Sequence, residues 1–226
     1  ADAWARLSDE ERGQLTEWMR VYYAMVANLD DNIGRLLHAI RQMGLEEDSI
    51  IVFTSDHGEL FGAHGRRAKN IFYEEAVRVP FLVKWKGHLD AGTRRDFVFN
   101  TVDIMPSFLS LMGLPVPQKV EGCDLSACIL GEADTDEGAL MMCTGPTAVF
   151  GDGNEWRAYR TKRYTYAVFK SDGQKLLFDN QNDPYQMHNL IDDPAFAQTA
   201  SFLKEKMYAK MKEIGDTFEH NSYYEK

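Results

Sequence analysis

Residues 50–59 read IIVFTSDHGE and predict a β-strand that ends in polar residues. Its first four residues are β-branched or aromatic, which is typical of a strand covered on both faces. The residues from Thr54 onward are polar and mark the carboxyl end of that strand. A long helical pattern precedes the strand across a short acidic turn, and helix, turn and buried strand in this order predict an α/β fold with a parallel sheet.

The helical pattern upstream has its own start and stop signals. Ser8 followed by Glu11 is a capping-box pattern, and Gly44 is the expected stop. Between them, apolar residues recur at spacings of three and four as far as Ile40. This spacing predicts a long helix with one buried stripe.

Two types of structure follow the strand. A second apolar run over residues 79–85 and a helix from an Asp103 cap to Gly113 continue the α/β pattern. After residue 135, short strand-like runs separated by turn residues predict an antiparallel sheet, with a hairpin at residues 171–173. Asp193 and Pro194 then begin a last amphipathic helix. We therefore expect an α/β part over residues 1–135 and a small α+β subdomain over 136–226.

Composition narrows the class of protein. The 226 residues allow one large domain or two small ones, and 44% apolar residues indicate a globular chain. A net charge of -10 argues against nonspecific binding to nucleic acid or to anionic membrane. No apolar run reaches the ~18 residues that a membrane-spanning helix needs. The three cysteines fit ordinary thiols, because their spacing does not suit a zinc site. They do not indicate a cellular compartment.

Asp56 and His57 are the first polar pair beyond the strand that suits a metal. In open parallel sheets, ligands bind beyond the carboxyl ends of the strands. A carboxylate and an imidazole in that place are suitable ligands for a divalent cation, and Gly58 lets the backbone turn away. The alternative is structural, with Asp56 capping a turn and His57 satisfied in the core.

The segment after this pair carries positive charge. Residues 62–69 read GAHGRRAK, with two glycines, His64 and three cations, among them Lys69. Such a loop is able to cradle an anion. A solvated basic loop is the alternative, and His64 fits either an anion site or a structural bond within the loop.

Residues along nearly the whole chain match, in order, the pattern of a known family. They are residues 22–24 and 29–34, Asp56 to Glu59, Gly62, His64, Gly65, Lys69, Tyr73 to Glu75, Arg78 to Pro80, residues 103–106 and 113–115, and, near the end, residues 159–161, 163–164, 178–179, 182–184 and 189–190. In these residues the sequence resembles the second half of a type I sulfatase of the alkaline phosphatase superfamily.

The resemblance implies a function for several of these residues. Asp56 and His57 would ligate a divalent cation, usually calcium in sulfatases. Lys69 would be the catalytic and substrate-binding lysine that neutralises the sulfate ester, and His64 is a second candidate for substrate binding. Glu74 and Glu75, with Arg78, fit an internal ion-pair group that shapes the loop.

The chain departs from the family pattern at the nucleophile. A sulfatase needs Cys or Ser in the pattern Cys/Ser-x-Pro-x-Arg, which is converted to formylglycine, and the sequence lacks this pattern. The opening residue Ala1 also suggests a chain cut from something longer. We therefore expect the nucleophile and two aspartate ligands in a missing amino-terminal part of the same protein, and we expect this chain to be inactive alone. The alternatives are a phosphonate monoester hydrolase or phosphodiesterase of the same superfamily, and a non-catalytic module.

Overall fold

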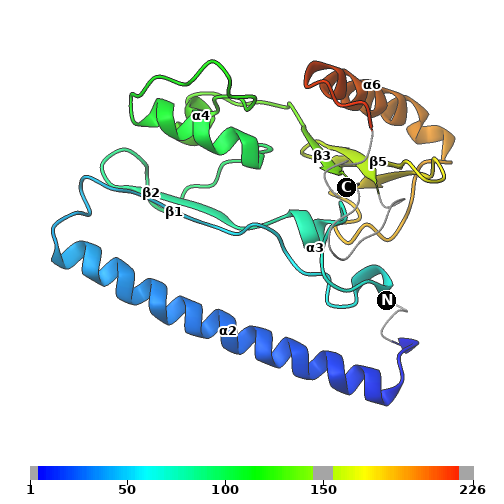
Figure 1. Cartoon of the computed structure of the whole chain (residues 1–226), viewed down its shortest axis with the longest axis horizontal. Coiled ribbons are helices and arrows are strands. Elements are labelled where there is room, and N and C mark those ends of the chain that lie inside the picture. Colours follow the sequence, from blue (N-terminus) through cyan, green and yellow to red (C-terminus); the bar gives the residue numbers. More distant parts are fainter. Residues whose placement is uncertain (1–4, 145–154, 219–226) are drawn as a thin grey trace, which may run out of the picture. The chain divides into compact units, whose positions relative to one another are not determined.

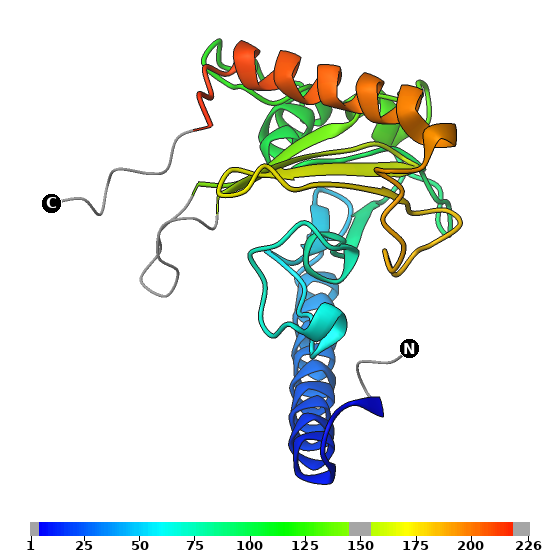
Figure 2. The same cartoon turned by 90° about the vertical axis from the view of Figure 1, so that its right-hand side faces the viewer.

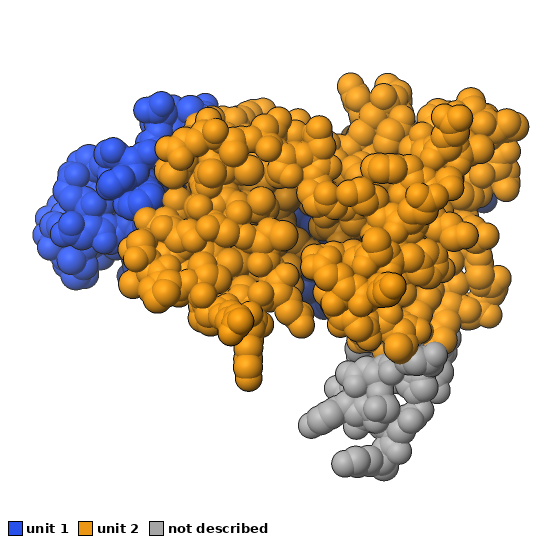
Figure 3. All heavy atoms as spheres, turned by 90° about the horizontal axis from the view of Figure 1, so that it is seen from above, with its two compact units in different colours: residues 1–70, 75–93 blue, residues 71–74, 94–226 orange. Residues whose placement is uncertain are grey.

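The computed structural model describes residues 5–144 and 155–218. The chain divides into two compact units, which Figure 3 colours separately. The first unit holds residues 1–70 and 75–93, and the second holds residues 71–74 and 94–226. Each unit is described by itself below.

Helix α2 (Asp9–Gln42) is the longest element of the first unit (Figure 1). The Ser8 side chain accepts a hydrogen bond from the Glu11 backbone, and the Glu11 carboxylate accepts one from the Ser8 backbone, which completes the predicted capping box. At the other end Gly44 has a left-handed φ of 71°, and its N–H donates to the Arg41 carbonyl. Both predicted ends of the helix are confirmed.

The buried stripe expected on α2 is wrong for most of its length. Leu15 is buried at 3% exposure, whereas Met25 is 65% exposed and Leu29 is 51% exposed. The periodicity is present, but the described residues do not cover the apolar face beyond its first turns. A repeating apolar pattern fixes which face of a helix is apolar and leaves open what covers that face.

Strands β1 (Ile50–Thr54) and β2 (Phe81–Trp85) form the sheet of the first unit. They pair antiparallel, with Val52 opposite Val83. The expectation of parallel pairing is wrong for these two strands. The expectation that β1 is buried on both faces is wrong as well, because Val52 is 39% exposed. An apolar run predicts a strand, but the direction of its neighbour depends on how the intervening residues return the chain.

The second unit contains a four-stranded antiparallel sheet in the order β3-β4-β5-β6. Its strands are β3 (Ala139–Cys143), β4 (Trp156–Arg160), β5 (Tyr164–Phe169) and β6 (Lys175–Asp179). The hairpin between β5 and β6 turns at Gly173, which has a left-handed φ of 67°. The antiparallel pairing of β4, β5 and β6 and the hairpin were predicted from the sequence and are confirmed, whereas β3 was not predicted.

Helix α6 (Ala197–Glu213) lies along one face of this sheet (Figure 2). Asp193 caps the short helix η2 (Pro194–Phe196) that leads into it, because its side chain accepts from the Ala195 N–H. The predicted apolar face of α6 is buried in the core of the unit. That core consists of Leu140, Tyr159, Tyr166, Val168, Leu177, Leu203, Met207 and Met211.

Helices α4 (Thr101–Leu111) and α5 (Ser126–Leu130) complete the second unit. Asn100 caps α4, whereas Asp103 was expected to do so; Asp103 is the third helical residue, and its carboxylate accepts from the Asn100 backbone. The Asn100 side chain also donates to the Leu140 carbonyl at 3.3 Å. The chain passes from the first unit to the second for the last time between residues 93 and 94. The domain boundary near residue 135 stays a prediction.

Candidate functional site

Asp56 and His57 lie directly beyond the carboxyl end of β1, as predicted. The Asp56 side chain is 82% exposed and that of His57 is 38% exposed. Neither side chain points into an apolar core. The strand therefore presents both groups at its edge, where a ligand has access to them.

Hydrogen bonds fix the Asp56 carboxylate. The His57 backbone N–H donates to Asp56 Oδ1 at 2.9 Å, and the Ser55 hydroxyl lies 3.2 Å from the same oxygen. The bond from the His57 N–H is the main cause that lowers the pKa of Asp56 below its usual value. The carboxylate is thus held ionised, with its second oxygen, Oδ2, turned toward the His57 ring.

The His57 ring is oriented by the backbone. Its Nδ1 lies 2.8 Å from the Gly58 carbonyl oxygen, which only accepts, so Nδ1 carries the proton. In the neutral ring Nε2 then holds a lone pair, and it lies 3.4 Å from Asp56 Oδ2. Two acceptors that face each other need a proton or a cation between them.

This arrangement fits one shared divalent cation. Two ligands at ~2.3 Å from the same ion and at about a right angle to each other are ~3.3 Å apart. A ligating histidine also usually donates its other ring N–H to a carbonyl or carboxylate, as His57 does. Within residues 5–144 and 155–218, no group of three or more histidine, cysteine or acidic side chains gathers for a metal. The described residues thus contain a pair of candidate ligands, not a full coordination shell.

Gly58 is required by close packing. A β-carbon at this position would lie 1.9 Å from the Glu75 carbonyl oxygen. The Gly58 N–H donates to the Ala76 carbonyl at 2.8 Å, in the one-turn helix α3 (Glu74–Val77). The chain after His57 is therefore held directly against backbone, which fixes the direction in which His57 leaves the strand.

The cationic loop over residues 61–70 has an unusual backbone. Six of its residues have left-handed φ angles between 45° and 93°: Phe61, Gly62, His64, Gly65, Ala68 and Asn70. Four of these six are not glycine, and a left-handed conformation costs such a residue about 1–2 kcal/mol. The short helix η1 (Ala63–Gly65) lies within the loop. Such strain persists only where surrounding contacts impose it.

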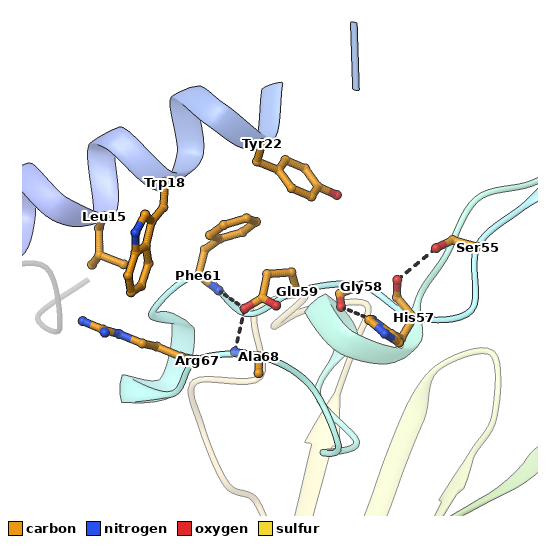
Figure 4. Close-up of a pocket in the computed structure, with 10 residues that line it drawn as sticks. All are labelled: Leu15, Trp18, Tyr22, Ser55, His57, Gly58, Glu59, Phe61, Arg67 and Ala68. Carbon is orange, nitrogen blue, oxygen red and sulfur yellow. Dashed lines mark hydrogen bonds between the residues drawn. The ribbon is translucent and has the colours of Figure 1, made fainter. Parts of the chain in front are cut away.

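Glu59 supplies two of those contacts. Its Oε1 accepts from the Ala68 N–H at 2.6 Å and from the Phe61 N–H at 3.3 Å (Figure 4). The Leu60 N–H donates in addition to the Ala68 carbonyl at 3.0 Å. The Glu59 carboxylate thus joins the two ends of the loop. The sequence motif includes Glu59, but the sequence alone gave it no role.

Three contacts hold the loop against the first turns of α2. The Arg67 guanidinium carbon lies 4.6 Å from the centre of the Trp18 ring, and the Phe61 and Tyr22 rings are 4.9 Å apart. A β-carbon at Gly62 would come within 3.4 Å of Leu15. The α2 residues in these contacts, Leu15, Trp18 and Tyr22, are three and four positions apart and so lie on one face of the helix. Together with Ser55 and residues 57–59, these side chains line a pocket of about 520 Å³ (Figure 4).

The sequence pointed to Lys69 and His64 in this loop, and the structure places them differently. Lys69 is exposed, between the left-handed residues Ala68 and Asn70. The His64 side chain is only 9% exposed, and its Nε2 lies 3.4 Å from Glu75 Oε2. That geometry favours the structural alternative for His64, and a part in substrate binding stays a prediction for both residues.

Glu74 has a partner that the sequence did not suggest. Its carboxylate binds the Arg160 guanidinium through two bonds of 2.6 and 3.0 Å, and both residues belong to the second unit. The Glu74 N–H also donates to Gln186, which is buried and left-handed, with a φ of 50°. Glu74 thus forms an ion pair, but the expected partner Arg78 is wrong, since its partners Arg160 and Gln186 lie 86 and 112 positions away along the chain.

Comparisons with known proteins agree on the family. The family model described as Sulfatase matches residues 4–114, and the one described as N-sulphoglucosamine sulphohydrolase, C-terminal, matches residues 62–213. An ulvan-active sulfatase from Formosa agariphila is 40% identical over 212 residues, which are 92% of this chain and 41% of that protein. The chain thus spans about two fifths of the length of the curated relatives that it matches.

Solved structures show the same fold. A protein solved in complex with its substrate D-glucosamine-2-N,6-O-disulfate matches 91% of this chain and 42% of its own, with 28% identity and a TM-score of 0.84. The phosphonate monoester hydrolase of Agrobacterium radiobacter matches 88% of this chain and 42% of its own, with 25% identity and a TM-score of 0.77. The expected fold class, part of an alkaline-phosphatase-like α/β domain with a small antiparallel α+β subdomain, is confirmed.

The described helices were also compared with the requirements of a membrane span, and each of them is too short or too polar to cross a bilayer.

Both family models and the curated relatives lead to one assignment, in which the model of the carboxy-terminal region covers most of the chain. The chain belongs to the sulfatase family, and it matches the carboxy-terminal portion of a type I sulfatase.

Proposed function

We propose that this chain supplies two metal ligands and a sulfate-binding lysine to a sulfuric ester hydrolase. The observation that carries the proposal is the Asp56–His57 pair, in which Nδ1 is occupied by a carbonyl and Nε2 faces a carboxylate oxygen at 3.4 Å. The family assignment supports the same reading, because the relatives are sulfatases. The substrate in this proposal is a sulfate ester.

Asp56 and His57 would hold a divalent cation, for which we propose calcium. Bound there, the cation would polarise the ester oxygens. The exposed Asp56 carboxylate supplies a hard oxygen ligand, and the Gly58 carbonyl keeps His57 in the tautomer that can ligate. With two ligands from the described part of this chain, other oxygens must complete the shell, so we expect this chain alone to bind calcium weakly.

Lys69 would act on the substrate as a compact positive charge. It is exposed in a loop with two other cations, in a chain whose net charge is -10. An anionic ester approaching such a chain needs a local cation to offset the field. An ammonium near the ester oxygens is worth more as negative charge develops, so it stabilises the transition state more than the ground state.

The nucleophile would come from elsewhere in the protein. The sequence has no Cys/Ser-x-Pro-x-Arg pattern, and we propose that formylglycine lies in an amino-terminal part that completes the site. The exposed apolar face of α2, with Met25 and Leu29, is a surface that such a part would cover. On this proposal the chain alone hydrolyses neither aryl sulfates nor phosphate esters.

One alternative has a specific observation behind it. The chain resembles the phosphonate monoester hydrolase of Agrobacterium radiobacter in structure at a TM-score of 0.77, so the same half-site suits phosphonate or phosphodiester chemistry. A non-catalytic module is the other alternative, and it is favoured by the absence of a nucleophile pattern in this sequence.

The test joins this chain to the amino-terminal part of the Formosa agariphila relative. The joined protein is assayed in single turnover with an aryl sulfate and an aryl phosphonate. Lys69→Ala should lower the rate on the sulfate by 10²–10³-fold, about 2.7–4 kcal/mol, while the control Lys119→Ala, at another exposed lysine, should leave it unchanged. Equal rates for Lys69→Ala and the parent would contradict the proposal, and a preference for the phosphonate would favour the alternative.

A second measurement needs only this chain. Calorimetric titration with calcium should give a dissociation constant no tighter than millimolar, which Asp56→Ala weakens further. Binding in the micromolar range would show a complete site within the chain and contradict the half-site proposal.

A further inference from the structure

We propose that Glu59 is the positioning residue for Lys69. This inference rests on the function proposed above for Lys69, and it adds a residue to which neither the motif nor the family assignment gives a role. Glu59 touches no reacting atom in this proposal. It acts by closing the loop that carries the lysine.

The geometry of the closure is specific. Glu59 Oε1 accepts from the Ala68 N–H at 2.6 Å, one residue before Lys69, and from the Phe61 N–H at 3.3 Å. These two donors are seven positions apart in sequence, so the carboxylate brings the beginning and the end of the loop together. Hydrogen bonds to an ionised group are the stronger kind, so this contact contributes more than a neutral bond.

The backbone around Lys69 explains why such a contact is needed. Ala68 and Asn70, the two neighbours of Lys69, both have left-handed φ angles, 66° and 70°. Neither is glycine, so each returns to an ordinary conformation unless something holds it. The bond from the Ala68 N–H to Glu59 holds the first of them, and with it the direction in which the Lys69 side chain leaves the backbone.

The other contacts of the loop do not replace this one. Arg67 on Trp18 and Phe61 on Tyr22 join the loop to α2, and they restrain residues 61–67. The Glu59 carboxylate, in contrast, binds the Ala68 N–H, and the one backbone bond to Ala68 described above, from the Leu60 N–H, reaches its carbonyl instead. Loss of this carboxylate should therefore loosen the lysine end of the loop and leave its attachment to α2 in place.

The first test uses this chain and needs no activity. Trypsin cuts after Arg66, Arg67 and Lys69, and after Lys119 in an exposed loop of the second unit as an internal reference. Glu59→Ala should raise cleavage at the three loop sites about tenfold or more relative to Lys119. Glu59→Gln keeps an acceptor oxygen and should give an intermediate rate, whereas Glu132→Ala, at an exposed glutamate of the second unit, should change nothing.

A loop cleaved equally in all variants would overturn the proposal. If Glu59→Ala does not fold, the ratio of loop to Lys119 cleavage in Glu59→Gln decides instead. Hydrogen exchange of the wild-type chain gives a further check. The Ala68 amide should exchange at least tenfold more slowly than the Lys69 amide, and equal exchange would contradict the closure.

The second test measures positioning in the joined protein with the Formosa agariphila part. Glu59→Ala should lower the single-turnover rate about tenfold when Lys69 is present. In a protein that already carries Lys69→Ala it should cause no further loss, since Glu59 acts through that lysine. Equal effects in both backgrounds would show that Glu59 has only a structural role. The two tests can also separate the proposals. If the joined protein shows no activity that depends on Lys69 but trypsin gives the expected cleavage pattern, the proposed function is contradicted and the loop closure is supported.

Discussion

Helices α2 and α6 have the same kind of apolar pattern and opposite surroundings. On α6, Leu203, Met207 and Met211 are buried against the antiparallel sheet, and each is at most 3% exposed. On α2, the matching residues beyond the first turns are open, and Met25 is 65% exposed. The second unit therefore carries its own core, whereas the first leaves most of its longest helix uncovered by the described residues.

This difference separates two kinds of stability within one chain. In the second unit, packing and hydrogen bonds between distant residues contribute to the folded state, for example at the Glu74–Arg160 pair. In the first unit, α2 depends more on its own capping box and helix propensity. Substitutions should therefore have large effects in the second unit and small effects on α2.

The largest difference is expected between two methionines in matching roles. Met207→Ala removes a fully buried side chain and should lower the free energy of unfolding of the second unit by about 2–5 kcal/mol. Met25→Ala should change that of the first unit by less than ~0.5 kcal/mol, since its side chain is already exposed. Denaturant titration followed by hydrogen exchange of peptides from each unit measures both. A large loss for Met25→Ala would mean that a second copy or another segment covers α2 in solution.

A pH-dependent difference is expected between two ion pairs. Asp216 accepts two bonds from the Arg157 guanidinium, at 2.5 and 2.8 Å, and this buried partner lowers the pKa of Asp216. A carboxyl with a lowered pKa contributes stability above its unfolded pKa of ~3.9, and that contribution is lost as pH falls through the folded pKa. Asp9, by contrast, is fully exposed beside Arg12.

Asp216→Asn should therefore remove a slope of up to ~1.4 kcal/mol per pH unit from the stability of the second unit below about pH 4. The control Asp9→Asn should leave the profile unchanged, because exposed pairs contribute little. Urea unfolding at a series of pH values from 2 to 6 measures both slopes. An unchanged slope in Asp216→Asn would show that this pair is not formed in solution.

The smallest effects are expected at the two capping boxes. Ser8→Ala should destabilise α2 by about 0.5–1 kcal/mol, since it removes the acceptor for the Glu11 N–H. Asn100→Ala should cost about 1–2 kcal/mol, because it also removes the bond to the Leu140 carbonyl. Thermal unfolding by circular dichroism, with Thr16→Ala as a mid-helix reference, compares them. Equal losses would mean that the bond to Leu140 adds nothing.

Local signals in the sequence were enough to predict several elements. Ser8 with Glu11, Gly44, Gly173 and Pro194 mark ends and turns that the structure has at the same places. Each of these signals acts between residues at most four apart, through a cap or a left-handed φ. The position of Asp56 and His57 beyond a strand was predictable for the same reason, since a strand's end is read from the change in residue type.

Contacts between distant residues were decided by the tertiary structure alone. The antiparallel pairing of β1 with β2, the exposure of α2 and the Arg160 partner of Glu74 all depend on where the chain returns in space. Asp103 shows the same limit at short range, because its side chain caps by reaching back to Asn100. Residue type determines which group can bond, and only the folded chain decides which partner comes within reach. For this reason the sequence pointed to Lys69, whereas the structure was needed to show that Glu59 closes its loop.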